Sequence, residues 1–179
     1  FCYVDNAVQA NLLAAVTDTP GLPRVLLIGD SISMGYTLDV RAKLAGKANV
    51  HRPLENCGDT ARGVASIDKW LGAGKWDVIH FNFGLHDAKY ASETTQRATR
   101  EQYAANLRTL IAQMKATGAK LIFATTTPVP KGGVLSPTRM KPGMVEGLGC
   151  KAEDLAEAKR NLAVIPDDFE HEQATCFNV

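Results

Sequence analysis

The sequence predicts an α/β fold in which helices cover both faces of an open, mostly parallel β-sheet. Two observations support this prediction. Short apolar runs alternate with helical patterns along the chain, and the runs are apolar throughout instead of alternating with polar residues. Strands of parallel sheets are buried on both faces and show such continuous runs. Because ligands bind these sheets at the carboxyl ends of their strands, the residues that follow each strand are the first place to look for function.

The expected elements follow one another in a regular order. Strands are expected at residues 25–28, 50–53, 78–83 and 121–124, with a last short strand at 162–165. Helices are expected at residues 38–44, 60–71, 100–115 and 154–160. Apolar residues recur at three- and four-residue spacing in the second and third of these helices, and glycines stop the first three. Residues 131–150 are crowded with glycine and proline, which predicts a long loop of the kind that is usually functional or mobile.

Length and composition indicate one globular domain. Of the 179 residues 45% are hydrophobic and 22% are charged, which excludes a disordered or fibrous chain. The formal net charge is +1, whereas a protein that binds nucleic acid through its phosphates shows a basic excess. No apolar run reaches the ~20 residues that span a bilayer. We therefore expect no nucleic-acid partner and no membrane span, with an N-terminal segment and linker at 1–23 and a single domain at 24–179.

Polar residues follow each of the first three expected strands, in the segments Gly29-Asp30-Ser31, Asn56-Cys57-Gly58 and Gly84-Leu85-His86-Asp87. Ser31 is the leading candidate nucleophile, because a hydroxyl between a buried strand and a helix is exposed at a tight turn. The amides at the start of a helix can also stabilise an oxyanion there. The alternative is that Ser31 only caps the helix.

The segments Gly29-Asp30-Ser31-Ile32, Asn56-x-Gly58 and Gly84-x-His86-Asp87 resemble, in order and spacing, the first three sequence blocks of the SGNH, or GDSL, hydrolase superfamily. The resemblance covers about residues 23–130, and residues 81–87 are similar to a bacterial branch. It implies a three-layer α/β/α sandwich with a flavodoxin-like sheet. It also implies a serine hydrolase that cleaves carboxylic esters through an acyl-enzyme, without a metal or organic cofactor. The implied substrates are small-molecule or carbohydrate esters with acetyl or other short acyl groups, and many such relatives are secreted or periplasmic.

The resemblance also assigns roles by position. Ser31 would be the nucleophile, and the amides of Ser31 and Gly58 would be two donors of an oxyanion hole. The superfamily has an asparagine as the third donor, where this chain has His86. A neutral imidazole N–H can donate the same hydrogen bond, and the alternative for His86 is a loop histidine bonded to the backbone. Three residues are expected to support the site through loop hydrogen bonds: Asp30, Asn56 and Asp87.

The last block of the superfamily is Asp-x-x-His, and Asp168-Phe169-Glu170-His171 has that spacing. In this assignment His171 takes the proton of Ser31 and Asp168 holds the imidazole tautomer, with Asp167 as an alternative for Asp168. A solvated acidic tail is the competing interpretation, because acidic residues crowd this stretch. Only residues 172–179 follow the block, where the superfamily usually has a closing helix, so an incomplete or rearranged domain is a further alternative.

Two other functions stay open on the residues alone. Without a base in the C-terminal block, the chain would be a catalytically defective SGNH-like domain. The hydroxyl-bearing loop 31–37 occupies the place where a flavodoxin-like binding module holds a flavin phosphate, although the Asp30 carboxylate argues against a phosphate.

The cysteines and histidines do not have the spacing of a metal site. The cysteines lie far apart in the sequence, at Cys2, Cys57, Cys150 and Cys176. This spacing does not suit structural zinc, and it leaves one or two disulfides and four buried thiols as alternatives. The four histidines show no HxH or HExxH pattern, so we expect no metal.

Overall fold

The computed structural model describes residues 18–92, 94–126 and 177–178, and its central element is a five-stranded sheet. Four neighbouring strands are parallel, in the order β2 (Asn49–His51), β1 (Arg24–Ile28), β3 (Val78–Phe81) and β4 (Lys120–Ala124). The short β5 (Phe177–Asn178) pairs with β4 in the antiparallel sense. Because only the pairing of β5 is antiparallel, the predicted mostly parallel sheet is confirmed. The strand order is that of flavodoxin-like sheets.

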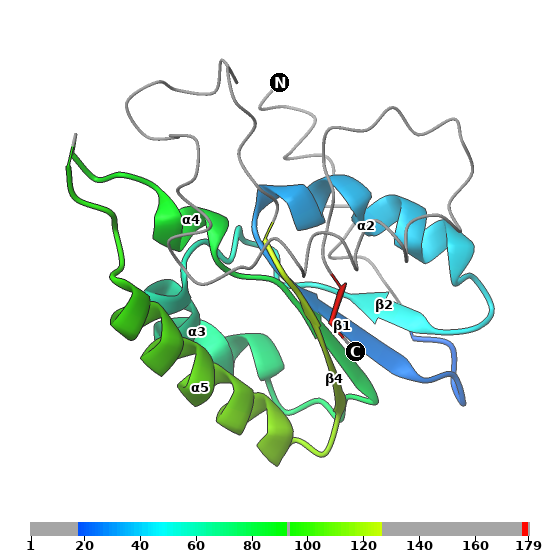
Figure 1. Cartoon of the computed structure of the whole chain (residues 1–179). Coiled ribbons are helices and arrows are strands. Elements are labelled where there is room, and N and C mark those ends of the chain that lie inside the picture. Colours follow the sequence, from blue (N-terminus) through cyan, green and yellow to red (C-terminus); the bar gives the residue numbers. More distant parts are fainter. Residues whose placement is uncertain (1–17, 93, 127–176, 179) are drawn as a thin grey trace.

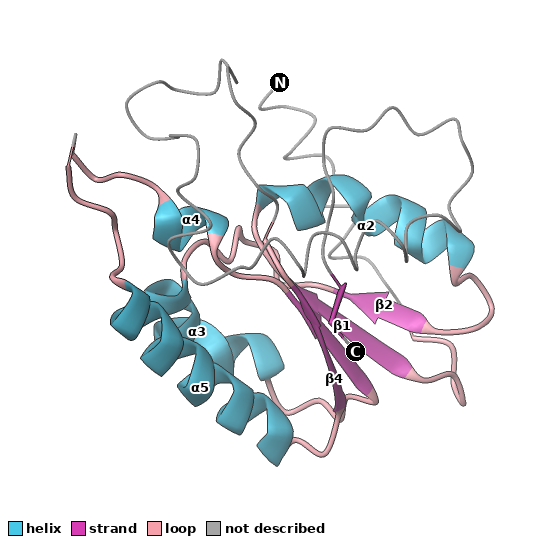
Figure 2. Ribbon diagram, viewed as in Figure 1, coloured by secondary structure: helices cyan, strands magenta, loops and turns pink. Residues whose placement is uncertain are grey.

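Helices lie on both faces of the sheet. Figure 1 shows α2 (Ser31–Lys43) on one face, and α3 (Thr60–Leu71) with α5 (Arg100–Ala116) on the other. The short α4 (Leu85–Ala88) follows β3 at the carboxyl end of the sheet. The same view coloured by secondary structure makes the three layers plain (Figure 2). The predicted three-layer architecture is therefore confirmed.

The first helix begins at Ser31, and the expected start at residue 38 is wrong. The apolar periodicity fails here because the buried residues of α2 are Ser33 and Thr37. Their hydroxyls donate to backbone carbonyls, Ser33 to Asp30 over 2.7 Å and Thr37 to Ser33 over 2.5 Å. A helix face that is buried through small hydroxyl residues has no hydrophobic signature in the sequence.

The other bounds differ less. Strand β2 occupies 49–51 instead of 50–53, and β3 ends two residues before the expected 83. The four-residue α4 was not expected, because one helical turn is too short to show a period. Burial on both faces is observed for the end of β1, whereas Ile122 in β4 is 38% exposed. The expected loop at 131–150, helix at 154–160 and strand at 162–165 lie outside the described residues.

The core lies between the sheet and the pair α3 and α5. Phe81 and Phe83 are buried there beside Leu110 and Met114 of α5. Gly63 of α3 allows the close approach, because a Cβ at this position would lie 3.0 Å from both Leu110 Cδ1 and Phe83 Cζ. This packing fixes the start of α3, and with it the loop that precedes it. Among the described residues no helix is long and apolar enough to cross a membrane.

Candidate active site

Ser31 stands at the junction between β1 and α2. It is the first residue of the helix, it is exposed, and it follows the buried pair Gly29 and Asp30. Asp30 is the helix cap: its carboxylate accepts the backbone N–H of Ile32 over 2.9 Å. The alternative in which Ser31 caps the helix is therefore wrong, because its neighbour takes that role. The Ser31 hydroxyl sits at the carboxyl edge of the sheet, where parallel sheets hold their ligands.

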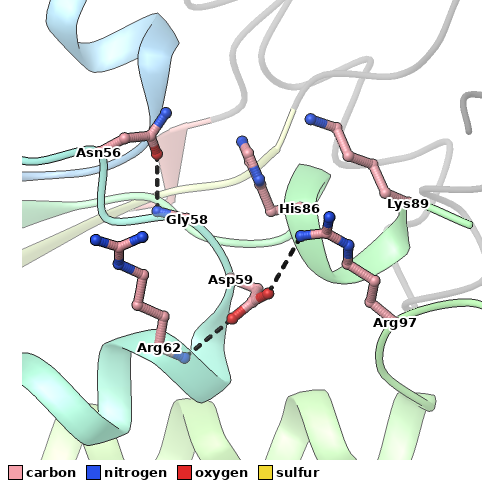
Figure 3. A pocket seen from close by; sticks show the side chains of 7 residues that line it. All are labelled: Asn56, Gly58, Asp59, Arg62, His86, Lys89 and Arg97. Carbon is pink, nitrogen blue, oxygen red and sulfur yellow. Dashed lines mark hydrogen bonds and ion pairs between the residues drawn. The ribbon is translucent and has the colours of Figure 1, made fainter. Parts of the chain in front are cut away.

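The loop of Gly58 is tied to the same edge. The backbone N–H of Cys57 donates to the Gly29 carbonyl over 3.2 Å, which joins this loop to the end of β1. Gly58 has φ = 66°, a left-handed conformation that glycine adopts without steric cost. Asn56 shapes the loop as expected, since its Oδ1 accepts the Gly58 N–H over 2.9 Å (Figure 3). The candidate oxyanion donor of Gly58 is thus bound to a side chain of its own loop.

Asp59 continues this loop as the cap of α3. Its Oδ1 accepts the backbone N–H of Arg62 over 2.9 Å. In the part of the chain that the structure describes, Cys57 is a free, buried thiol. Burial raises the pKa of the Cys57 thiol to about 11. The other three cysteines lie outside the described residues.

His86 enters the site from α4. The helix follows Gly84, whose φ of 139° and tight packing against Thr126 suit only a glycine. The His86 side chain is 18% exposed, and its Nε2 lies 3.6 Å from Oδ2 of Asp30. Burial, followed by the charge of Lys89, lowers the pKa of His86, while Asp30 acts in the opposite direction. The imidazole is therefore biased toward its neutral form.

Asp87 is fully buried and links α4 to the start of α3. Its two carboxylate oxygens lie 3.0 and 3.1 Å from the backbone N–H of Thr60, and it also accepts the Thr60 hydroxyl. Burial raises the pKa of Asp87, and the Thr60 hydrogen bonds oppose that rise. Asp87 and Asp30 thus accept backbone hydrogen bonds, as the sequence predicts. Because Thr60 lies two residues after Gly58, the link also sets the distance between the Gly58 loop and His86.

A cavity of about 390 Å³ opens beside these groups. It is lined by residues of the Gly58 loop, of α3, of α4 and of the segment that follows α4: Asn56, Gly58, Asp59, Arg62, His86, Lys89 and Arg97 (Figure 3). Sequence reasoning missed its charged members. For Asp59 and Lys89 the signal was proximity to the motifs, since Asp59 directly follows Gly58 and Lys89 comes two residues after Asp87.

The three sequence blocks thus meet at one edge of the sheet. Contacts join the Gly29-Asp30 turn to the Gly58 loop and to His86, and Asp87 joins the Gly58 loop to α4. The candidates Asp168 and His171, with the alternative Asp167, lie outside the described residues. Within the part of the chain that is described, no group of histidine, cysteine or acidic side chains could hold a metal ion.

No protein-family model matches the sequence, and no curated protein matches it. Solved structures do match. A protein from Bacteroides fragilis assigned as an acylhydrolase has a TM-score of 0.56 at 15% identity, over 90% of this chain and 75% of that one. A GDSL-like lipase from Bacteroides thetaiotaomicron has a TM-score of 0.55 at 19% identity, over 89% and 76%. A lipase/acylhydrolase from Enterococcus faecalis has 0.54 at 23%, over 71% and 67%. The chain therefore has the fold of the SGNH, or GDSL, hydrolases.

Proposed function

We propose that the protein is a serine hydrolase that cleaves carboxylic esters, with Ser31 as its nucleophile. One observation carries the proposal: an exposed serine begins α2 at the edge of the sheet where the Gly58 loop and His86 also converge. The likeness to acylhydrolase and GDSL-like lipase structures supports the same chemistry. Acetyl or other short acyl esters, including those on carbohydrates, are the substrates that the resemblance of the sequence blocks to the SGNH superfamily implies.

The reaction follows the general scheme of nucleophilic acyl transfer. The Ser31 hydroxyl attacks the ester carbonyl as a base takes its proton, and the tetrahedral intermediate collapses to an acyl-enzyme as the alcohol leaves with that proton. Water, deprotonated by the same base, then releases the acid. The base that we assign is His171, held in its tautomer by Asp168, on the strength of their spacing in the sequence.

Three donors would stabilise the oxyanion: the amides of Ser31 and Gly58 and a ring N–H of His86. The lowered pKa of His86 favours a neutral ring, which retains one N–H to donate. In the structure the Gly58 amide is bound to Asn56, so substrate binding must displace that side-chain oxygen. Loss of one such donor typically costs ~10²–10³ in rate, so turnover would depend on whether the Asn56 oxygen leaves the Gly58 amide when substrate binds.

The flavodoxin-like alternative loses support at the helix start. A flavin phosphate would need the amides of the first turn of α2, and the Asp30 carboxylate already accepts the one at Ile32. A second anion beside that carboxylate would be repelled. We therefore propose no flavin site.

Hydrolysis of 4-nitrophenyl acetate and labelling with a fluorophosphonate test the proposal. Ser31→Ala should lower kcat/KM by at least about 10³-fold and abolish labelling. Ser66→Ala, which removes a hydroxyl from α3, serves as the matched control and should retain the activity. A Ser31→Ala variant as active as the unaltered protein would refute the nucleophile, and an unaltered protein that neither hydrolyses the ester nor takes the label would refute the function. His171→Ala with full activity would overturn the assignment of the base.

A further inference from the structure

Arg52 is a buried arginine that directly follows β2. Only 6% of the residue is exposed, although arginines are almost never fully buried unless they are paired. Burial lowers the pKa of its guanidinium, which shows that the charged side chain is unfavourable in this place unless its contacts compensate. The groups that Arg52 contacts therefore have to explain why it is there.

One nitrogen of Arg52 holds the turn that presents Ser31. Its Nη2 donates to the carbonyl of Gly29 over 3.3 Å and to the hydroxyl of Ser33 over 3.2 Å. These two acceptors lie two residues before and two residues after Ser31. Ser33 extends the contact, because its own hydroxyl donates to the carbonyl of Asp30 over 2.7 Å. The segment from Gly29 to Ser33, called the nucleophile turn below, is thus bonded to Arg52 at both of its ends.

The same nitrogen reaches the loop of the second proposed oxyanion donor. It donates to the carbonyl of Glu55 over 3.5 Å, three residues before Gly58. The backbone N–H of Cys57 donates to the Gly29 carbonyl over 3.2 Å, so the loop and Arg52 share one acceptor in the nucleophile turn. Because β2 lies beside β1 in the sheet, the residue after β2 is placed to bridge these two segments (Figure 1).

We propose that Arg52 is a positioning residue, which fixes the Ser31 hydroxyl relative to the Gly58 amide through its bonds to the nucleophile turn and to the loop. The inference rests on the proposed ester hydrolysis. In acyl transfer the nucleophile attacks the carbonyl carbon while the amides hold its oxygen, so their separation has to fit the transition state. A misplacement of about 1 Å can cost about 10²-fold in rate. Arg52 therefore acts on kcat more than on KM.

Substitution of Arg52 tests this role in the hydrolysis of 4-nitrophenyl acetate. Arg52→Met should lower kcat about 10²-fold and change KM by less than about threefold. Arg52→Lys retains a charged donor and should lose only about tenfold. Arg24→Met is the matched control, since it removes a guanidinium that also donates to a backbone carbonyl, that of Lys75 over 3.1 Å, at the opposite end of β1. It should leave kcat within about threefold, and a folded Arg52→Met variant with so small a loss would overturn the inference.

Ser33→Ala keeps the test decisive if Arg52→Met does not fold. This substitution removes one acceptor of Arg52 and leaves the guanidinium in place. It should lower kcat about fivefold, and the double variant of Arg52→Lys and Ser33→Ala should lose less than the product of the two single losses, because both residues act through one contact. Losses that multiply would show that the two residues act separately, and would contradict the inference.

Hydrogen exchange separates this inference from the proposed function. The N–H of Cys57, which bonds to the Gly29 carbonyl, reports whether the loop stays joined to the nucleophile turn. Its exchange, measured by NMR, should be about tenfold faster in Arg52→Lys than in the unaltered protein, and within about threefold in Arg24→Met. If the unaltered protein hydrolyses no ester, the proposed function fails, and this comparison still decides whether Arg52 holds the two segments together. Equal exchange at Cys57 in Arg52→Lys and the unaltered protein would overturn the inference.

Discussion

Asp87→Ala should be among the most damaging single substitutions in the described part of the protein. Asp87 and Thr60 are both fully buried, and the carboxylate accepts the backbone N–H and the hydroxyl of Thr60. The Thr60 hydroxyl also accepts a hydrogen bond from Asn106 of α5 over 3.2 Å. Three helices therefore meet in one network, which is buried at Asp87 and Thr60, and removal of the carboxylate leaves two donors of Thr60 without an acceptor.

The magnitude follows from these groups. A buried donor left without a partner costs about 1–3 kcal/mol, so two give roughly 2–6 kcal/mol. Part of this is offset, because burial of the Asp87 carboxylate is itself unfavourable, as the direction of its pKa shift indicates. We expect a net loss of about 2–4 kcal/mol in the free energy of unfolding. For a domain of this size that corresponds to a fall in Tm of roughly 5–15 °C.

Urea unfolding followed by tryptophan fluorescence measures this loss, because Trp70 and Trp76 are both buried in the core. Asp87→Asn should lose less than Asp87→Ala, since the amide oxygen still accepts from Thr60. Asp39→Ala, at an exposed position on α2, is the matched control and should stay within ~0.5 kcal/mol of the unaltered protein. An Asp87→Ala variant that loses less than about 1 kcal/mol would refute the reasoning that the network is buried and fully bonded.

Three further predictions concern other buried or bonded groups. Burial lowers the pKa of His80, so the unfolded chain takes up the proton first and the free energy of unfolding should fall as the pH drops below 6.5. Between pH 7.5 and 5.5 the Tm of His80→Gln should therefore fall less than the Tm of the unaltered protein, and equal falls would contradict this. The Cys57 thiol, with a pKa of about 11, should resist iodoacetamide at pH 7.5 and react in urea, and mass spectrometry of its peptide checks both. Asn56→Asp would set a carboxylate beside the Gly58 amide and should lower kcat at least tenfold; an unaltered kcat would argue against an oxyanion at Gly58.

The sequence predicted the parts of the fold that have a strong hydrophobic period or a clear stop. Residues 60–71 were predicted to be a helix, and α3 has these bounds and ends before Gly72. The start of α2 was missed, because Ser33 and Thr37 are buried through hydrogen bonds to the backbone and not through apolar contact. Periodicity detects only burial that is driven by apolar surface.

The candidate site was predicted to a similar extent. Strand ends and motif spacing place Asp30, Ser31, Gly58 and His86 together, because parallel strands bring their carboxyl ends to one edge. The cation Arg97 could not be predicted, since it comes from a connection between α4 and α5 with no regular period. The Asn56 bond to Gly58 was expected only as loop support, and the structure adds that it occupies a candidate donor.

The charged side chains of the cavity affect His86 through the protonation and the tautomer of its ring. A neutral imidazole carries one N–H, and the Asp30 carboxylate 3.6 Å from Nε2 attracts that proton to Nε2. Burial of the ring, and after it the charges of Lys89 and Arg97, lower the pKa of His86 and so oppose a second proton on the ring. An oxyanion bound at His86 must therefore share the Nε2–H with Asp30 or receive an Nδ1–H from the other tautomer. An asparagine amide has no such dependence, so a histidine at this position would make the proposed donor sensitive to the charges around the cavity.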